Sequence, residues 1–522
     1  MTQTRCVSGC KGLETEICEK APRCSYANGE KRQFCRLSRT FKMNRKDCGV
    51  VRKTNKTQKV IAIQQFMKNT TSKRRSEFLK AICSDSGFCY ALGKNRRKIY
   101  GLFDGFVDFD YVKPPIVAIG NPSSNGFVKS IRYERHGYTA NAVLKSSTKS
   151  AADNLAYEFL VGTFLNIMGN QFPCFVQTYG FYYYKTHAAW THARDTKRIS
   201  SNIMKASLKL HLSLHEYNEY KQDIAKVIDD EACEFSKYAA VLIQHFPNVI
   251  TFGDYLDNMS RDNGGWCNFT LKELPYILYQ IYMPLAAMSK VFTHYDLHKN
   301  NVLLYEPVPG KYIQYHYHHE KETVKFKSQF IAKIIDYGRA FYKDTEVKNA
   351  SATDVLKRTC VLDECNLDGE ECGDQSGFRY LTNTLKPSTY YMSSSEYNPS
   401  ADLRLLDLVN DSFDKYGLNA GHGECGPADS EEDAFESIAR ILSMISYGTG
   451  LHPDQNKYGT KPFKQSGLPD HINNVNDAEE VIRNELKTNI ALKAFNETYF
   501  DNMEKICDIH VYSDGRNMKV KM

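Results

Sequence analysis

The chain has 522 residues, of which 42% are hydrophobic and 25% are charged, and its formal net charge is +7. This is an ordinary globular composition, so it excludes a wholly disordered, collagen-like or coiled-coil chain. The longest apolar stretch, residues 274–292, is broken by prolines, Gln280 and Lys290, which excludes a membrane span there and predicts a buried helix. Charged residues and two cysteines occupy the start, where a secretory signal has its apolar core, so we expect a cytosolic product without a transmembrane segment.

Charge is unevenly distributed along the chain. The first 100 residues contain 24 Lys and Arg against 7 Asp and Glu, whereas the rest of the chain is net negative. Such a basic segment is typical of a region that contacts nucleic acid or another anionic surface. A solubilising or packaging extension is the equally favoured alternative.

A basic, cysteine-rich module is predicted at residues 1–60. Six cysteines fall within the first 48 residues, where few large apolar side chains are available to form a core, so cross-links or a metal must hold the segment together. Their spacings lack the paired C-x2-C knuckles of zinc fingers, which favours disulfides over zinc. Residues 61–112 are expected to pack as an extension on the domain that follows.

A nucleotide-binding hairpin is the next predicted element. A strand over 115–119 runs into a small, polar turn over 120–128 that can present N–H groups to phosphate. Within this turn Gly126 and Val128 fall on a G-x-G-x-x-G-x-V register, and Gly120 precedes them. The strand over 138–145 ends in Val-Leu-Lys, a pattern whose lysine, here Lys145, grips the α- and β-phosphates of a nucleotide.

A helix and a hinge are predicted after this strand. Glu158 lies in a stretch whose apolar residues repeat at helical spacing, so a helix there allows Glu158 to pair with Lys145 and orient it. Residues 239–247 are predicted to form a buried strand leading into a hinge. The backbone of Gln244, His245 and Phe246 is the candidate for hydrogen bonds to adenine.

The most specific motif is His294-x-Asp296-Leu-x-x-x-Asn301, which follows the predicted helix over 274–292. In phosphoryl transfer such an aspartate accepts the proton of the attacking hydroxyl, and the asparagine turns back to hold a metal ion. Downstream, an apolar strand ends at Asp336-Tyr337-Gly338, where a carboxylate can hold Mg²⁺ between the phosphates.

Taken in order, these motifs resemble the eukaryotic-type protein kinase fold, and residues 399–406 resemble the start of the core helix of its large lobe. The resemblance implies an α+β, two-lobed fold behind the cysteine-rich extension. A small antiparallel β-sheet lobe would span 113–247, with an insertion at 185–236. A large helical lobe would span 248–522, with a hairpin inserted at 306–329, a second insertion at 343–395 and helices over 451–522.

The resemblance also implies a serine/threonine protein kinase that transfers the γ-phosphoryl group of ATP, with Mg²⁺, to hydroxyls of protein substrates. Asp296 would be the catalytic base, Lys145 and Glu158 the phosphate clamp, and Asn301 and Asp336 the metal ligands. Val128, Val143 and Leu303 would enclose the adenine. Asp402 would support the loop that carries Asp296.

More narrowly, the chain is similar to serine/threonine kinase-like proteins of large nucleocytoplasmic DNA viruses, of which the poxvirus virion kinases are distant members. The cysteine-rich basic start, the run over 82–89, the pair Tyr295 and His298, and Asp402-Leu-Arg-Leu carry this likeness. It implies synthesis in the host cytoplasm and packaging in the virion beside other virion proteins.

Two positions depart from the kinase pattern. His298 stands where serine/threonine kinases usually have a lysine that contacts the γ-phosphate, and Lys299 is a candidate replacement. Tyr295 replaces the arginine before Asp296, so activity is expected not to depend on phosphorylation of the activation segment. Three hypotheses stay open: a protein kinase, an atypical small-molecule phosphotransferase, and a catalytically weak or inactive structural protein of the virion.

Overall fold

The computed structural model divides the chain into two compact units, Met1–Ser76 and Glu77–Met522. The second unit combines helices with several sheets, which is compatible with the predicted α+β class. The structure describes residues 24–29, 32–37, 103, 106, 109–123, 126–135, 138–147, 154–184, 186–196, 204–206, 239–246, 249–259, 265–345, 351–356, 394, 397–416, 429–445 and 472–521.

In the first unit the described residues form one antiparallel hairpin. Strand β1 (Cys24–Gly29) pairs along its whole length with β2 (Arg32–Leu37), and Tyr26 lies opposite Cys35. The hairpin belongs to the predicted cysteine-rich module. The cysteine side chains that would form the predicted cross-links or bind zinc lie outside the described part of the chain.

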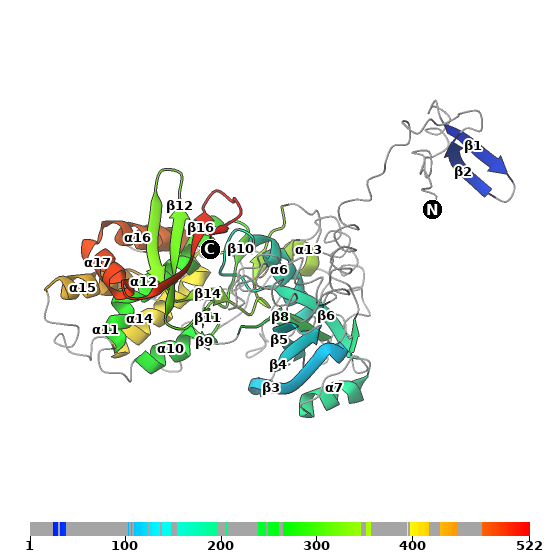
Figure 1. Ribbon diagram of the computed structural model, residues 1–522, viewed down its shortest axis with the longest axis horizontal. Coiled ribbons are helices and arrows are strands. Elements are labelled where there is room, and N and C mark those ends of the chain that lie inside the picture. Colours follow the sequence, from blue (N-terminus) through cyan, green and yellow to red (C-terminus); the bar gives the residue numbers. More distant parts are fainter. Residues whose placement is uncertain are drawn as a thin grey trace, which may run out of the picture. The chain divides into compact units, whose positions relative to one another are not determined.

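The second unit contains a six-stranded antiparallel sheet with the spatial order β3-β4-β5-β8-β6-β7 (Figure 1). Its strands are β3 (Val112–Ser123), β4 (Gly126–Arg135), β5 (Tyr138–Ser147), β6 (Thr178–Tyr184), β7 (Met204–Ala206) and β8 (Ala239–Gln244). Buried and half-buried side chains alternate along β4 and β5, as expected for strands packed on one face. The half-buried face carries Val128, Val143 and Lys145.

An aromatic cluster packs against this sheet. Phe106 stacks on Tyr179 with ring centroids 4.5 Å apart, and Phe109 meets Tyr182 edge-on at 4.9 Å. The Tyr182 hydroxyl donates a hydrogen bond of 2.7 Å to the carbonyl of Phe106. The segment that precedes β3 therefore contributes large side chains to the core beside the sheet.

Helix α6 (Asn154–Met168) is fastened to the sheet through β6. The Asn166 side chain donates to the carbonyl of Thr178 over 2.8 Å and accepts from the N–H of the same residue over 2.9 Å. The rings of Phe159 and Phe181 pack beside this pair of hydrogen bonds, 5.7 Å apart. These contacts fix the helix that carries Glu158 relative to the strands.

Further along the chain, helices surround the buried helix α12 (Leu274–Ala287). Every side chain from Leu274 to Leu285 is buried, which confirms the predicted buried helix, and Pro275 lies in the first turn, where proline is tolerated. The other helices here are α10 (Phe252–Met259), α11 (Gly265–Lys272), α14 (Arg404–Tyr416), α15 (Asp429–Ser443), α16 (Val475–Thr488) and α17 (Ile490–Phe500). Among the residues that the structure describes, no helix is both long and apolar enough to cross a membrane.

Two small antiparallel sheets flank the segments that carry the sequence motifs. In the first, β11 pairs with β9 and β14, and in the second β10 pairs with β15. Their bounds are β9 (Val249–Thr251), β10 (Phe292–Thr293), β11 (Val302–Tyr305), β14 (Ile331–Ile334) and β15 (Phe341–Tyr342). The segment His294–Asn301 thus lies between β10 and β11, and Asp336 lies between β14 and β15.

A four-stranded sheet forms from distant parts of the chain, in the order β13-β12-β16-β17 (Figure 1). Its strands are β12 (Lys311–His318), β13 (Thr323–Ser328), β16 (Glu504–Tyr512) and β17 (Lys519–Lys521). The hairpin predicted within 306–329 is confirmed. The prediction of helices over 451–522 is wrong for the last part, because Cys507, Ile509 and Val511 alternate at strand spacing and pair parallel to β12.

The insertion predicted at 185–236 is only partly described. Its described residues form a short helix, α7 (His187–Asp195), and strand β7. Three short helical segments complete the described elements: η2 (Phe109–Tyr111), α13 (Ala352–Leu356) and η3 (Ala401–Leu403).

Candidate active site

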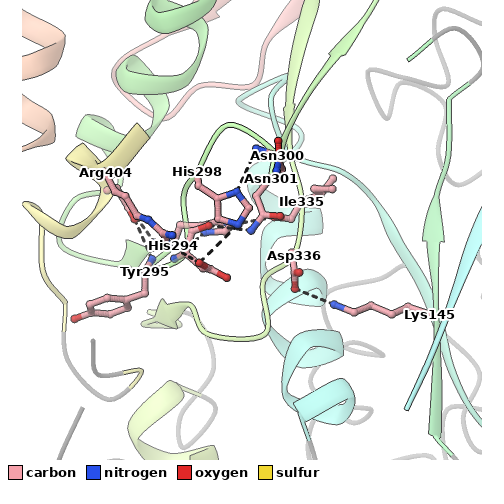
Figure 2. A network of polar contacts seen from close by, with 11 residues as sticks. Lys145, His294, Tyr295, His298, Asn300, Asn301, Ile335, Asp336 and Arg404 are labelled. Carbon is pink, nitrogen blue, oxygen red and sulfur yellow. Dashed lines mark hydrogen bonds and ion pairs between the residues drawn. The ribbon is translucent and has the colours of Figure 1, made fainter. Parts of the chain in front are cut away.

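Lys145 lies near the end of β5 on its half-buried face. The register pairs Lys145 with Val128 on β4 and with Val241 on β8, so the two neighbouring strands hold it from both sides. Its ammonium lies 2.8 Å from the Glu158 carboxylate of α6 and 2.8 Å from the carboxylate of Asp336. The structure therefore brings together three predicted site residues from separate parts of the sequence, and Figure 2 shows the contact between Lys145 and Asp336.

The charges of Lys145 and Asp336 stabilise one another, whereas burial, and to a lesser extent the Asp336 carboxylate, raises the pKa of Glu158. Burial alone would lower the pKa of Lys145, but the carboxylates of Asp336 and Glu158 outweigh it and raise that pKa above its usual value. The Asp336 side chain is 44% exposed but partly desolvated by its neighbours, and the Lys145 ammonium outweighs this desolvation and lowers the pKa of the carboxyl to about 2. At neutral pH a lysine cation thus sits next to an ionised Asp336, as a group that handles phosphate and metal requires.

The loop that carries Asp296 is tied to the segment before Asp336. The side-chain amide of Asn301 donates to the Asp296 carbonyl over 2.9 Å, and the N–H of Ile335 donates to the Asn301 carbonyl over 3.0 Å. His294 joins the same two segments, because its Nε2 lies 2.9 Å from the carbonyl of Ile335 and its Nδ1 accepts from the Asp296 N–H (Figure 2). Asp296, Asn301 and Asp336 are therefore held as one hydrogen-bonded group.

Strained backbone conformations occur next to Asp296 and at Asp336. In the described part of the chain three residues other than glycine have a positive φ, and two of them are Tyr295 (63°) and Asp336 (68°). Such conformations cost free energy and persist only where surrounding contacts enforce them, which is typical of functional sites.

Asp402 supplies the contacts that enforce the conformation of the loop. Its side chain is buried, and its two carboxylate oxygens accept the N–H groups of His294 and Tyr295 over 2.8 and 2.9 Å. The Tyr282 hydroxyl of α12 donates to the Asp402 carbonyl over 2.9 Å. The role expected of Asp402 as a support for this loop agrees with these hydrogen bonds.

Arg404, at the start of α14, is the site residue that the motif analysis missed. Its Nη1 lies 2.7 Å from Oδ1 of Asp296, and both side chains are nearly buried, 8% and 13% exposed. The Nε2 atom of His298 lies 3.9 Å from the same oxygen, and burial lowers the pKa of this imidazole. The only local signal for Arg404 was an arginine inside the otherwise apolar run that follows Asp402.

Lys299 does not stand where the sequence suggested a replacement for the missing lysine. Its ammonium lies 3.4 Å from the Ser412 hydroxyl and 3.9 Å from the Asp257 carboxylate. These partners belong to α14 and α10, so the side chain is directed to them and not to Asp296. These contacts do not favour Lys299 as a replacement for that lysine.

The residues expected to contact adenine lie in two kinds of environment. The N–H of Gln244 donates to the carbonyl of Gln177 over 2.8 Å, and the N–H of His245 donates to the carbonyl of Asn141 over 3.3 Å. These two donors are engaged within the protein, and the Phe246 ring is buried against Tyr305 with centroids 4.8 Å apart. The side chains of Val128, Val143 and Leu303 are half-buried, and the first two share the face of Lys145.

The predicted glycine-containing turn is tighter than expected. Gly120 lies inside β3 and Gly126 is the first residue of β4, so the strands extend into the segment expected to be a turn. The register between Ile119 and Ser123 is irregular, which places a bulge at Gly120 and its neighbours. The two glycines therefore belong to the end of a hairpin that stands beside Lys145.

Metal ligands were predicted at Asn301 and Asp336. Within the described ranges no group of three or more His, Cys, Asp or Glu side chains could hold a metal ion. Mg²⁺, however, commonly takes only one or two protein carboxylates and fills its shell with phosphate oxygens and water. An amide and an ionised carboxylate joined through Ile335 fit that kind of site.

Comparisons with known proteins add no family assignment. A scan against protein-family models finds no match, and a search of curated proteins finds no significantly similar sequence. The likeness to kinases therefore rests on the motifs and on the geometry described above.

Proposed function

We propose that the chain is a serine/threonine protein kinase with the two-lobed fold of that family, transferring the γ-phosphoryl group of Mg-ATP to protein hydroxyls. The observation that carries this proposal is the ion-paired group of Lys145, Glu158 and Asp336. Lys145 and Asp336 are 191 positions apart in the sequence, yet their charged atoms are 2.8 Å apart. Charge-paired side chains gathered from distant motifs favour chemistry over structural support.

In the proposed reaction each residue has one task. Lys145, oriented by the buried Glu158, binds phosphate oxygens of the nucleotide. Asp296 accepts the proton of the attacking hydroxyl, while that oxygen forms a bond to the γ-phosphorus and the bond to the ADP oxygen breaks. Asn301 and Asp336 would hold Mg²⁺, which when bound neutralises charge on the phosphates.

The decisive experiment compares phosphate transfer by the full chain and by Asp296→Asn, with Mg-ATP and a mixture of protein acceptors. The variant keeps the shape of the side chain but is a far weaker proton acceptor, so we expect transfer to fall at least about 100-fold. Asp514→Asn, an exposed aspartate paired with Arg516, is the matched control and should transfer at the wild-type rate. Equal rates for wild type and Asp296→Asn would refute the proposal.

A small-molecule phosphotransferase is the second candidate, and His298 favours it because this position lacks the lysine of serine/threonine kinases. A panel of protein acceptors, aminoglycosides and choline distinguishes the two activities. A purely structural role is tested by thermal shift: a chain that gains no stability from Mg-ATP would support it. Analysis of purified virus particles by mass spectrometry tests the proposed host cytoplasm and virion location.

A further inference from the structure

The pair formed by Arg404 and Asp296 is the contact of the candidate site that no motif explains. The proposed base, Asp296, forms an ion pair with Arg404 at the start of α14, and the Arg404 side chain is only 8% exposed. Figure 2 shows Arg404 on one side of the loop and Lys145 with Asp336 on the other. The cation next to Asp296 is therefore separate from the lysine that the site uses for phosphate.

We propose that Arg404 is a positioning residue for phosphoryl transfer, which holds Asp296 in one orientation and supplies beside it the permanent positive charge that His298 does not carry. This inference rests on the proposed kinase function. Arg404 makes and breaks no covalent bond: the hydroxyl proton goes to Asp296, and the γ-phosphoryl group moves from ATP to the acceptor oxygen, with ADP as the leaving group.

The position of Arg404 on the chain suits this role. Asp402, two residues earlier, binds the backbone N–H groups of His294 and Tyr295, and Arg404 binds the side chain of Asp296. One short segment at the junction of η3 and α14 thus fixes both the backbone of the loop and the carboxylate that it presents. A side chain fixed by its surroundings is ready for reaction without further ordering.

The alternatives to Arg404 are weaker on geometric grounds. The Lys299 ammonium is directed to Ser412 and Asp257, on helices α14 and α10. The His298 imidazole lies 3.9 Å from Asp296 Oδ1, beyond hydrogen-bond distance, and an imidazole has no permanent charge. Among these described side chains, Arg404 lies nearest to Asp296, at 2.7 Å, and a guanidinium remains charged at any working pH.

The experiment measures kcat, and the KM for ATP and for a protein acceptor, in Arg404→Gln, Arg404→Lys and the double variant Arg404→Gln with His298→Lys. We expect Arg404→Gln to lower kcat roughly 100-fold and to change the KM for ATP less than about threefold, because the lost contact acts on the base and not on nucleotide binding. A lysine at position 298 returns a cation to the loop, so the double variant should recover at least about tenfold in kcat. Arg440→Gln, an exposed arginine of α15, is the matched control and should behave as wild type.

A purely structural role for Arg404 would not give this pattern, since a new lysine in the loop would not repair a damaged helix start. The inference is wrong if Arg404→Gln keeps the wild-type kcat, or if it folds with lowered kcat that the second substitution fails to raise. Should Arg404→Gln not fold, Arg404→Lys decides: a kcat within about tenfold of wild type supports the role, and complete loss in a folded protein refutes it. If wild type and Asp296→Asn are equally inactive, the proposed function fails and this inference with it; active wild type with unaffected Arg404 variants refutes only the inference.

Discussion

At the scale of single residues, Lys145 has two partners in different surroundings. The Glu158 side chain is 4% exposed, whereas that of Asp336 is 44% exposed. A carboxylate as buried as Glu158 depends on its counter-charge, because an unpaired buried charge is strongly destabilising. Asp336 can exchange Lys145 for water or a metal ion at lower cost. Glu158 thus belongs to the framework of the site and Asp336 to its working surface.

This difference predicts the behaviour of a pair of variants. Lys145→Met should abolish phosphate transfer and also lower the free energy of unfolding by about 3 kcal/mol, since it leaves Glu158 buried without its partner. Adding Glu158→Gln should restore much of that stability while transfer stays absent. Urea unfolding and a transfer assay on both variants measure the two effects, with Lys113→Met, on an exposed side chain, as control. A double variant no more stable than Lys145→Met would contradict this account.

Some site residues could be predicted from sequence and others could not. Lys145, Asp296 and Asp336 each stand in a local pattern in which a strand or loop runs into a polar residue, so their neighbours in the sequence reveal them. Arg404 acts on Asp296, 108 positions earlier, and no local spacing encodes that contact. The same reason applies to Lys299: proximity in sequence suggested a role, whereas its ammonium lies near Ser412 and Asp257.

At the scale of elements, Glu273 connects the start of α12 with the turn between β13 and β14. Its carboxylate oxygens accept the Ser328 hydroxyl over 2.6 Å and the N–H of Gln329 over 2.9 Å. Burial raises the pKa of this carboxyl to about 8, although both hydrogen bonds oppose the shift. The group therefore binds a proton more tightly in the folded chain than in the unfolded chain.

The sign of this shift predicts how stability depends on pH. Between the unfolded pKa near 4.5 and the folded value near 8, the folded chain holds more protons, so the contribution of Glu273 is full below about pH 4.5 and is lost as the pH rises to about 8. Glu273→Gln should remove this dependence. The free energy of unfolding of the variant, relative to that of wild type, should therefore rise by up to about 1.4 kcal/mol per pH unit between about pH 4.5 and 8. Urea unfolding at three pH values measures the difference, with exposed Glu436→Gln as control. If the free energies of unfolding of Glu273→Gln and wild type differed by the same amount at all three pH values, Glu273 would be excluded as the cause of the pH dependence.

At the scale of the whole second unit, the four-stranded sheet joins the inserted hairpin to the end of the chain. His316 of β12 and Asp508 of β16 are 192 positions apart, yet their side chains are 2.9 Å apart. Cys507, Ile509 and Val511 of β16 are essentially inaccessible to solvent. The hairpin is therefore an integral part of the fold and not surface decoration.

This burial predicts unequal effects of substitutions along the last strands. Ile509→Ala should lower the free energy of unfolding by about 2–4 kcal/mol, since it removes a buried side chain and leaves a cavity. Lys519→Ala, on the exposed edge strand β17, should change stability by less than about 0.5 kcal/mol. Chemical unfolding of the two variants tests the prediction, and similar effects at both positions would contradict it.

Much of the local architecture of this unit follows from the sequence, but its long-range pairing does not. The alternation of Tyr315 and Tyr317 with polar residues predicts the β12–β13 hairpin, and the apolar run from Leu274 predicts α12. Strand β16 carries the same alternation, but it directly follows helices α16 and α17 in a charged region, so the prediction of helices over 451–522 extended across it. Strand β16, the parallel partner of β12, is separated from it in the sequence by several helices. The spacing of hydrophobic residues within a strand does not show which distant strand it pairs with.

The parallel pairing of β12 with β16 also sets an order for biosynthesis. The ribosome delivers β12 long before β16, so the nascent hairpin has one unsatisfied strand edge until β16 has been synthesised. A polypeptide that stops before β16 would contain every proposed catalytic side chain but could not close this sheet. Such a product is a natural target for chaperones and proteases, which would couple the appearance of activity to the synthesis of β16.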